Sequence, residues 1–321
     1  MPPTPVQPQP HPQSQPQPQC QPQSQSRRRA VQPGEPTVGT DRLHEPRRPD
    51  CPWCGSGRLR TRPRTPDLLR HRPGTSVLDE CEDCAHAFRN PRPTTEGLAF
   101  RHRGSHENQD RRHRAAARAM LPFPEPESWL DVGTGHGHFP EAAKELFTYT
   151  SFDGTDPTAR VERARTAGRV EEAHRGRLPD LAGRLRARYD VVSMFHHLEH
   201  SPDPREELRA ALAVLRPGGH LLVEAPDPDR PFGALLGKRW VSCCRPQHLH
   251  LMPLRNLLAE LDALGCSVVS TGRREPHVPY DPTGALAPLL RRARFSDAYR
   301  IIARKNPRAD ACTDARATSC R

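Results

Sequence analysis

The chain has 321 residues, of which 49 are Lys or Arg, 38 are Asp or Glu and 38 are Pro, and 34% are hydrophobic. No apolar run approaches the ~18–20 residues that span a bilayer, and the first residues lack the apolar core of a secretory signal, so we expect a cytoplasmic protein without membrane contact. Residues 129–275 carry 20 basic and 20 acidic side chains, so the net charge of +11 comes from the flanks. This distribution argues against a dedicated nucleic-acid-binding surface, which would concentrate the excess on one face.

The N-terminal segment is of low complexity. Residues 1–26 are almost entirely Pro, Gln and Ser. Such a segment has too few apolar side chains to offset the entropy lost on ordering, and we expect disorder throughout residues 1–50. Arg27–Arg29 is either a solvated charge cluster or a contact for an acidic partner. Residues 307–321 are expected to form a second disordered tail.

Two cysteine pairs mark the start of the ordered chain. Cys51 and Cys54 have two residues between them, and so have Cys81 and Cys84. Paired thiolates at this spacing can point at one tetrahedral cation, which favours a zinc ribbon over residues 51–93. Four thiolate ligands leave no coordination position for water, so the Zn²⁺ is expected to be structural. An iron–sulfur cluster and two disulfides remain alternatives.

The rest of the chain predicts a helical linker over residues 94–127, helical mainly at 111–120, and then an α/β domain over 128–306. Short apolar strands alternate with helices there, which predicts a doubly wound, mostly parallel sheet covered on both faces. The expected strands are residues 129–132, 149–154, 190–195, 220–225, 268–271 and 299–303. The expected helices are residues 141–147, 158–167, 205–215, 254–264 and 285–292.

A glycine-rich turn follows the first strand of this domain. Gly133, Gly135 and Gly137 lie where the strand ends and a helix begins, so the backbone can turn sharply and approach a ligand closely. Asp156 ends the next strand, where a carboxylate can accept hydrogen bonds from the two hydroxyls of a ribose. Asp131 enters the turn and would repel a pyrophosphate, but it suits a cationic ligand with an amino group.

Four sequence blocks resemble the signature blocks of class I S-adenosylmethionine-dependent methyltransferases, and the resemblance covers residues 128–306. The blocks are Leu130–Gly137, Asp156–Pro157, Tyr189–Val192 and Leu215–Leu222. The resemblance implies a seven-stranded Rossmann-like sheet with S-adenosylmethionine as cofactor. It assigns the methionine end of the cofactor to Asp131, Gly133, Gly135 and Gly137, the ribose to Asp156, the adenine to Arg177 and Leu178, and the sulfonium to Met194 and Phe195.

The combination of a zinc ribbon with this domain resembles a bacterial subfamily that includes sugar C-methyltransferases. The blocks His196–Pro204 and Arg245–His250 support the resemblance. In those enzymes a glutamate is the proposed base that takes a proton from carbon, but the matching position here is Gln247, which cannot act as a base. His200 and His248 are therefore the acid–base candidates. Two other interpretations of these histidines stay open: local hydrogen bonding, and a second metal site formed by His196, Glu199, His200 and His248.

The predicted function is methyl transfer from S-adenosylmethionine to a small-molecule acceptor, such as a sugar nucleotide or a secondary metabolite. The loop over residues 226–245 is expected to close over the acceptor, with Trp240 as a stacking surface. One alternative is an RNA methyltransferase that uses the ribbon and the basic flanks to hold its substrate. A second alternative is a catalytically inactive scaffold or regulator that binds the cofactor.

Overall fold

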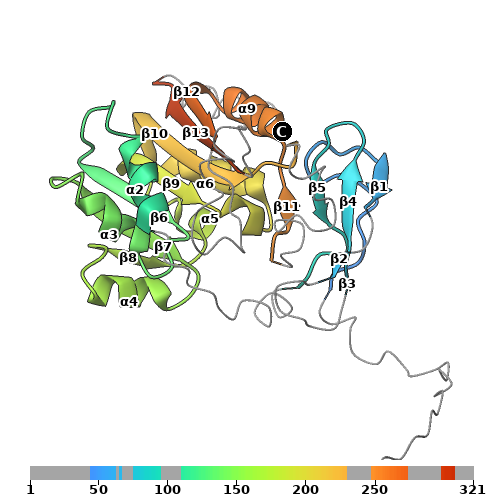
Figure 1. Ribbon diagram of the computed structural model, residues 1–321, viewed down its shortest axis with the longest axis horizontal. Helices are drawn as coiled ribbons and strands as arrows, with labels where there is room; N and C mark the ends of the chain where they lie inside the picture. The colour runs from blue at the N-terminus through green and yellow to red at the C-terminus, as the bar shows by residue number, and fades with distance from the viewer. Residues whose placement is uncertain are drawn as a thin grey trace, which may run out of the picture. The chain divides into compact units, whose positions relative to one another are not determined.

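Seven strands form one twisted sheet in the order β12-β13-β10-β9-β6-β7-β8 (Figure 1). The computed structural model describes residues 44–62, 65–66, 75–94, 110–229, 247–273 and 298–307. Strands β8, β7, β6, β9 and β10 run parallel, whereas β13 is antiparallel to both β10 and β12. The predicted mostly parallel, seven-stranded sheet is confirmed. Its strands are β6 (Ser128–Val132), β7 (Ser151–Asp156), β8 (Ala173–Arg175), β9 (Tyr189–Phe195), β10 (Leu215–Pro226), β12 (Cys266–Arg273) and β13 (Ala298–Lys305).

Burial on both faces explains why the central strands are continuous apolar runs. Successive side chains of a strand point to opposite faces, and Trp129 and Leu130 of β6 accordingly lie in two different hydrophobic clusters. Trp129 packs against the rings of Phe139, Phe147 and Phe152, with ring centroids 5.4–5.6 Å apart. The side chains of Trp129 and Leu130 are both fully buried.

The helices divide between the two faces of the sheet. Side chains of α2 and α3 join the cluster around Trp129, whereas those of α5, α6 and α9 join the cluster around Leu130. Asp203 caps α6 by accepting hydrogen bonds from the backbone N–H groups of Arg205 and Glu206. The helices are α2 (Asp110–Arg118), α3 (His138–Lys144), α4 (Arg160–Thr166), α5 (Leu178–Leu181), α6 (Pro204–Val214) and α9 (Leu254–Ala263).

The structure modifies two expectations about the N-terminal part. The helix expected in the linker over residues 94–127 is present as α2, but its Ala116 and Ala117 are buried against the sheet. Residues 44–50 do not belong to a disordered tail, since Arg47 forms an ion pair with Asp79 and the Arg48 amide donates to the Asn90 side chain. These polar contacts, rather than apolar burial, hold the segment in place.

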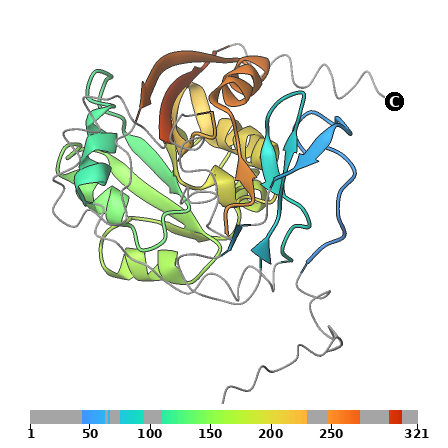
Figure 2. The same ribbon diagram turned by 45° about the vertical axis from the view of Figure 1, so that its right-hand side comes forward.

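A second, smaller sheet is formed by strands of the cysteine-rich segment together with one strand from residues 250–251. We call the cysteine-rich segment, residues 51–93, the cysteine module. Its four strands are in the order β1-β4-β5-β11, all antiparallel. Strand β11 comes from the other end of the chain, and Figure 2 shows it beside β5. The strands are β1 (Leu59–Thr61), β4 (Leu78–Cys81), β5 (Ala87–Arg89) and β11 (His250–Leu251), and a separate pair is formed by β2 (Thr65–Pro66) and β3 (Thr75–Ser76).

Several sequence-based expectations lie outside the described residues. These are the tails at 1–43 and 308–321, the helix at 285–292, and the loop segment 230–246 with Trp240. Within the ranges that are described, no helix combines the length and the apolar character that a membrane crossing requires.

Candidate active site and metal centre

The glycine turn after β6 is open at only one of its three glycines. Gly133, Gly135 and Gly137 all have positive φ, between 57° and 75°. A Cβ on Gly133 would lie 2.5 Å from the His197 ring, and a Cβ on Gly137 would lie 3.0 Å from Ala164. A Cβ on Gly135 would meet nothing within 4 Å. The protein itself thus fills the space at two of the glycines, and Gly135 borders the space into which a ligand can fit.

Asp131 is a buried carboxylate at the end of β6. Its Oδ1 accepts a hydrogen bond of 2.6 Å from the Ser193 hydroxyl, whose oxygen in turn accepts one from the Trp129 indole at 3.0 Å. Burial raises the pKa of Asp131 to about 6, although hydrogen bonds from Ser193 and Thr134 oppose the rise. A desolvated carboxylate of this kind gains free energy from a cationic partner, which fits an amino group of a ligand.

Asp156 faces the same turn from the end of β7. Its Oδ2 accepts from the Gly135 backbone N–H at 3.2 Å, and its Oδ1 accepts from the Thr158 amide at 2.8 Å and from the Thr158 hydroxyl. Parallel pairing of β7 with β8 brings Arg177 to the same edge, because the Gly176 amide donates to the Asp156 carbonyl. The predicted cofactor residues Asp131, Gly135 and Asp156 therefore meet at the carboxyl ends of two neighbouring strands.

The structure separates the remaining predicted cofactor residues into two groups. Arg177 and Phe195 are half-buried and lie at the strand ends; Phe195 packs on Phe139, with ring centroids 4.4 Å apart. Leu178 and Met194 have almost no exposed surface and belong to the hydrophobic core. The assignment of Leu178 and Met194 to the cofactor stays a prediction; in this structure their side chains pack in the core, whereas their sequence neighbours Arg177 and Phe195 are partly exposed.

Three histidines surround Glu199 after β9. The fully buried Glu199 accepts from His196 Nδ1 at 2.9 Å, and ligand atoms of Glu199, His200 and His248 all lie within 4.8 Å of one another. The rings of His200 and His248 are edge-to-face, 4.9 Å apart. Burial alone would raise the pKa of Glu199, but the hydrogen bond from His196 and the charges of His200 and His248 lower it to about 2. This arrangement can hold either a proton or a divalent metal ion.

His197 and His250 point elsewhere. His197 packs on Gly133 and forms a 3.3 Å ion pair with the buried Glu207. His250 forms a 3.0 Å hydrogen bond with His86, and burial lowers its pKa to about 4. The five histidines fall in two separate stretches of the sequence, 196–200 and 248–250, and only the structure shows which of them meet.

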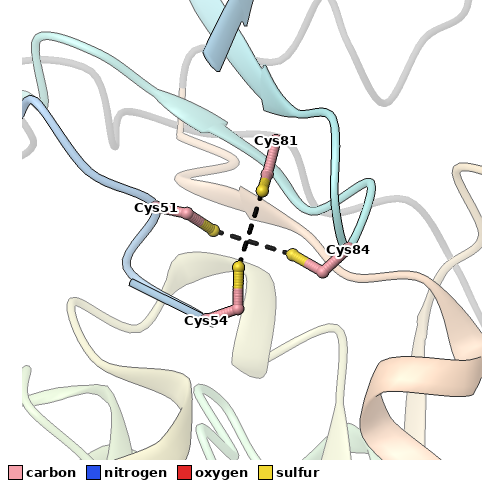
Figure 3. A group of neighbouring side chains, drawn as sticks. All are labelled: Cys51, Cys54, Cys81 and Cys84. Atoms are coloured by element: carbon pink, nitrogen blue, oxygen red, sulfur yellow. Dashed lines mark hydrogen bonds between the residues drawn. The ribbon is translucent and has the colours of Figure 1, made fainter. Parts of the chain in front are cut away.

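The four cysteines of the module converge on one point (Figure 3). The Sγ atoms of Cys51 and Cys84 are 3.7 Å apart and those of Cys54 and Cys81 are 3.5 Å apart, and none of the four forms a disulfide. A tetrahedron with Zn–S bonds of ~2.3 Å has S···S edges of ~3.8 Å, so the geometry fits a zinc ion. Gly55 and Ala85 follow the pairs, both with positive φ, and each donates its N–H to the carbonyl of the first cysteine of its pair.

Comparison with known proteins identifies the α/β part of the chain. The family profile described as "Methyltransferase domain" matches residues 100–271, more than half of the chain. The chain belongs to this methyltransferase family. The residues at this edge of the sheet fit S-adenosylmethionine as the methyl donor: a buried carboxylate for an amino group, a second carboxylate for a ribose, and an open glycine between them.

Among curated proteins, this chain is similar to enzymes named ubiquinone biosynthesis O-methyltransferase. The protein from Vibrio parahaemolyticus is 38% identical over 96 residues, 29% of this chain and 40% of that protein. The one from Sodalis glossinidius is 30% identical over 154 residues, 46% of this chain and 61% of that protein. The chain thus spans about half the length of the curated relatives it matches.

Two solved structures illustrate the backbone similarity. An O-methyltransferase family protein from Burkholderia thailandensis is 17% identical, with a TM-score of 0.45 over 62% of this chain and 57% of that chain. A SAM-dependent methyltransferase from Archaeoglobus fulgidus is 18% identical, with a TM-score of 0.46 over 63% of this chain and 96% of that chain.

Sequence reasoning missed several residues that support the site. Ser193 and Trp129 form the hydrogen-bonded chain behind Asp131, and Glu207 is the buried partner of His197. Arg89 of the cysteine module reaches the His248 segment. A polar residue inside an apolar strand is the signal that could have identified Ser193; the other contacts depend on the tertiary fold.

Proposed function

We propose that the protein methylates a hydroxyl oxygen of a small-molecule acceptor. The observation that carries this proposal is the hydrogen bond of 2.8 Å between His200 Nδ1 and the backbone carbonyl of Gln247. A carbonyl oxygen only accepts, so Nδ1 carries a proton, and Nε2 is the nitrogen that can take a proton from the acceptor when the ring is neutral. His200 is thereby oriented as a general base, beside the ionised carboxylate of Glu199, which stabilises the imidazolium formed after proton transfer.

Oxygen is favoured over carbon as the methylated atom. Proton abstraction from carbon requires a strong and well-placed base, and the position at which the related sugar enzymes have glutamate holds Gln247, whose backbone carbonyl instead orients His200. A phenolic or sugar hydroxyl can lose its proton to an imidazole as the new bond forms. The curated relatives named as O-methyltransferases support the same choice.

Cofactor binding is assigned to the edge of the sheet where β6 and β7 end. When bound, S-adenosylmethionine supplies an electrophilic methyl group. Asp131 would hold its amino group, Asp156 its ribose, and Gly135 would allow close approach of the backbone. Arg177 and Phe195 would border the adenine and the reacting end. These residues align the methyl group with the acceptor, and alignment supplies much of the rate in group transfer.

The cysteine module is assigned a structural zinc ion. The four-sulfur geometry leaves no position for water or acceptor, so the ion would stabilise the fold without entering the reaction. Zinc analysis of the purified protein, with a Cys81→Ser variant beside the wild type, tests this assignment. One equivalent of zinc in the wild type and loss of it in the variant is the expected result, and iron or no metal would contradict it.

A labelled methyl-transfer assay tests the proposed activity. Wild-type protein with methyl-labelled S-adenosylmethionine is incubated separately with catechols, sugar nucleotides and RNA, and transfer is expected to a small-molecule hydroxyl. His200→Gln should reduce kcat by about 100-fold, in the range of lost general-base catalysis, whereas the control His220→Gln, on β10 away from the cluster, should change it less than twofold. Transfer to RNA alone, or full activity of His200→Gln, would contradict the proposal.

A further inference from the structure

The cysteine module and the acceptor-side histidines share a strand pairing. Strand β5 of the module pairs with β11, with Phe88 opposite His250 and Ala87 opposite Leu251. The Arg89 backbone N–H extends the ladder by donating to the Leu249 carbonyl at 2.9 Å. In Figures 1 and 2, β11 lies against β5 and apart from the strands of the large sheet. The segment that contains His248 is therefore held by the module.

Arg89 adds a side-chain contact to this pairing. The residue is 97% buried, and its Nε donates to the backbone carbonyl of His248 at 3.1 Å. A buried guanidinium is costly unless its N–H groups are used, so this contact fixes the His248 peptide in one orientation. The neighbouring His86 ring, buried between Trp53 and Phe88, forms a hydrogen bond of 3.0 Å with the His250 ring.

The module also contacts the segment that follows His200, and two helices of the large domain in turn contact the module near its cysteines. Arg92 donates to the Pro202 carbonyl at 2.9 Å, two residues after His200. Arg205 of α6 donates to the Trp53 carbonyl at 2.8 Å, and Asn256 of α9 donates to the Cys84 carbonyl at 2.9 Å. Trp53 and Cys84 belong to the two metal-binding turns, so the contacts with the helices depend on how those turns are folded.

The cofactor turn is independent of these contacts. Asp131 bonds to Ser193, and Asp156 bonds to Gly135 and Thr158, all of them residues of the large sheet or its connections. None of the hydrogen bonds described for these carboxylates involves the cysteine module. A change in the module should consequently reach the acceptor side of the site and leave the cofactor side as it is.

We propose that Arg89 is a positioning residue for His248 and that the cysteine module, when its cysteines hold their metal ion, sets the geometry of the acceptor side of the active site. The chemical role of His248 and His200 rests on the proposed function, but the positioning itself does not. Metal loading then governs acceptor methylation through β5 and β11, while S-adenosylmethionine binds equally well with or without it.

Hydrogen–deuterium exchange on the full-length, metal-loaded protein tests this proposal without any acceptor. Arg89→Met should accelerate exchange in the peptide that covers residues 247–252 by about 10- to 100-fold, the range for a lost hydrogen bond to a charged donor. Arg89→Lys should restore part of the protection. Arg62→Met is the matched control, since Arg62 donates through the same atom to Glu80 inside the module, 2.7 Å away, and should leave residues 247–252 unchanged.

Two further readouts separate positioning from general loss of structure. The affinity for S-adenosylmethionine should change less than twofold in Arg89→Met and after removal of the metal with a chelator. The pH titration of the His248 imidazole, followed by NMR, should move in Arg89→Met and not in Arg62→Met. Unchanged exchange at 247–252 in Arg89→Met, equal acceleration in Arg62→Met, or a parallel loss of cofactor affinity would each overturn the proposal. Failure of the proposed function appears differently, as absence of cofactor binding in the wild type.

Discussion

Asp131 is the carboxylate assigned to the amino group of the cofactor, and its raised pKa allows this assignment to be tested by the pH dependence of unfolding as well as by cofactor binding. Its pKa is raised from 3.8 to about 6, so the folded state binds the proton more tightly than the unfolded chain does. The contribution of this carboxyl to stability is therefore largest below pH 4 and is lost as the pH rises through about 6. Each pKa unit corresponds to about 1.4 kcal/mol, which gives a penalty of about 3 kcal/mol at neutral pH for a side chain that is 97% buried.

Asp131→Asn removes the titrating group and keeps the shape of the side chain, including an oxygen that accepts from Ser193. The free energy of unfolding of the variant, measured by urea denaturation of the cofactor-free protein from pH 4 to pH 8, should rise by about 2.5 kcal/mol relative to that of the wild type over this range. The affinity of the wild type for S-adenosylmethionine should fall about tenfold between pH 7 and pH 5, as the carboxylate becomes protonated. The variant should bind weakly at both pH values.

Asp153 is the matched control, a buried aspartate on the neighbouring strand β7. Burial alone would raise its pKa, but hydrogen bonds from His174 and Tyr189 and the charge of Arg188 lower it. Asp153→Asn should therefore lose stability relative to the wild type at neutral pH, regain it as the pH falls, and leave cofactor affinity unchanged. The reasoning is refuted if Asp131→Asn and the wild type show the same pH dependence of unfolding, or if the variant binds S-adenosylmethionine as tightly as the wild type.

Four other substitutions give distinct expected outcomes. Gly135→Ala should fold, at a cost in stability of about 1–2 kcal/mol for its positive φ, and should lose cofactor affinity in calorimetry. Gly133→Ala should fail to fold, because its Cβ would lie 2.5 Å from His197. Equal behaviour of the two variants would contradict the assignment of the ligand to Gly135. Glu199→Gln should lower kcat at least tenfold with little effect on cofactor affinity, and a normal kcat would exclude Glu199 from the reaction. Ala85→Gly should raise stability by about 1 kcal/mol in thermal unfolding, since Ala85 has φ of 56° in the second cysteine turn, and a lower melting temperature would contradict this.

The large sheet was predictable because its strands are buried on both faces. Residues 129–132, 190–195 and 220–225 are apolar runs bounded by glycine, aspartate or proline, and each corresponds to an observed strand. Strand β8 was missed, since Ala173–Arg175 is too short and too polar to show a period, and it exists because β7 offers a free parallel edge. Strand β11 was missed for a stronger reason: its two residues pair with β5, more than 160 residues earlier in the chain.

The candidate site was predictable at the level of motifs and not at the level of side-chain direction. The glycine turn and the aspartates at the strand ends follow from local spacing, and the structure brings Asp131, Gly135 and Asp156 together. Which histidines lie together depends on His196, whose φ of 50° turns the chain directly after β9. After this turn His197 packs on Gly133, and His200 reaches the Gln247 carbonyl. No pattern in the sequence specifies that turn.

The most direct test of the cofactor site is calorimetric titration of the folded, metal-loaded protein with S-adenosylmethionine, beside an Asp156→Ala variant. Asp156 accepts the Gly135 N–H and is the carboxylate assigned to the ribose, so its removal should weaken binding by about 100-fold while the fold persists. Micromolar binding by the wild type that collapses in Asp156→Ala is the expected result. Absence of binding by the wild type, or equal binding by both proteins, would contradict the assignment of this site to S-adenosylmethionine.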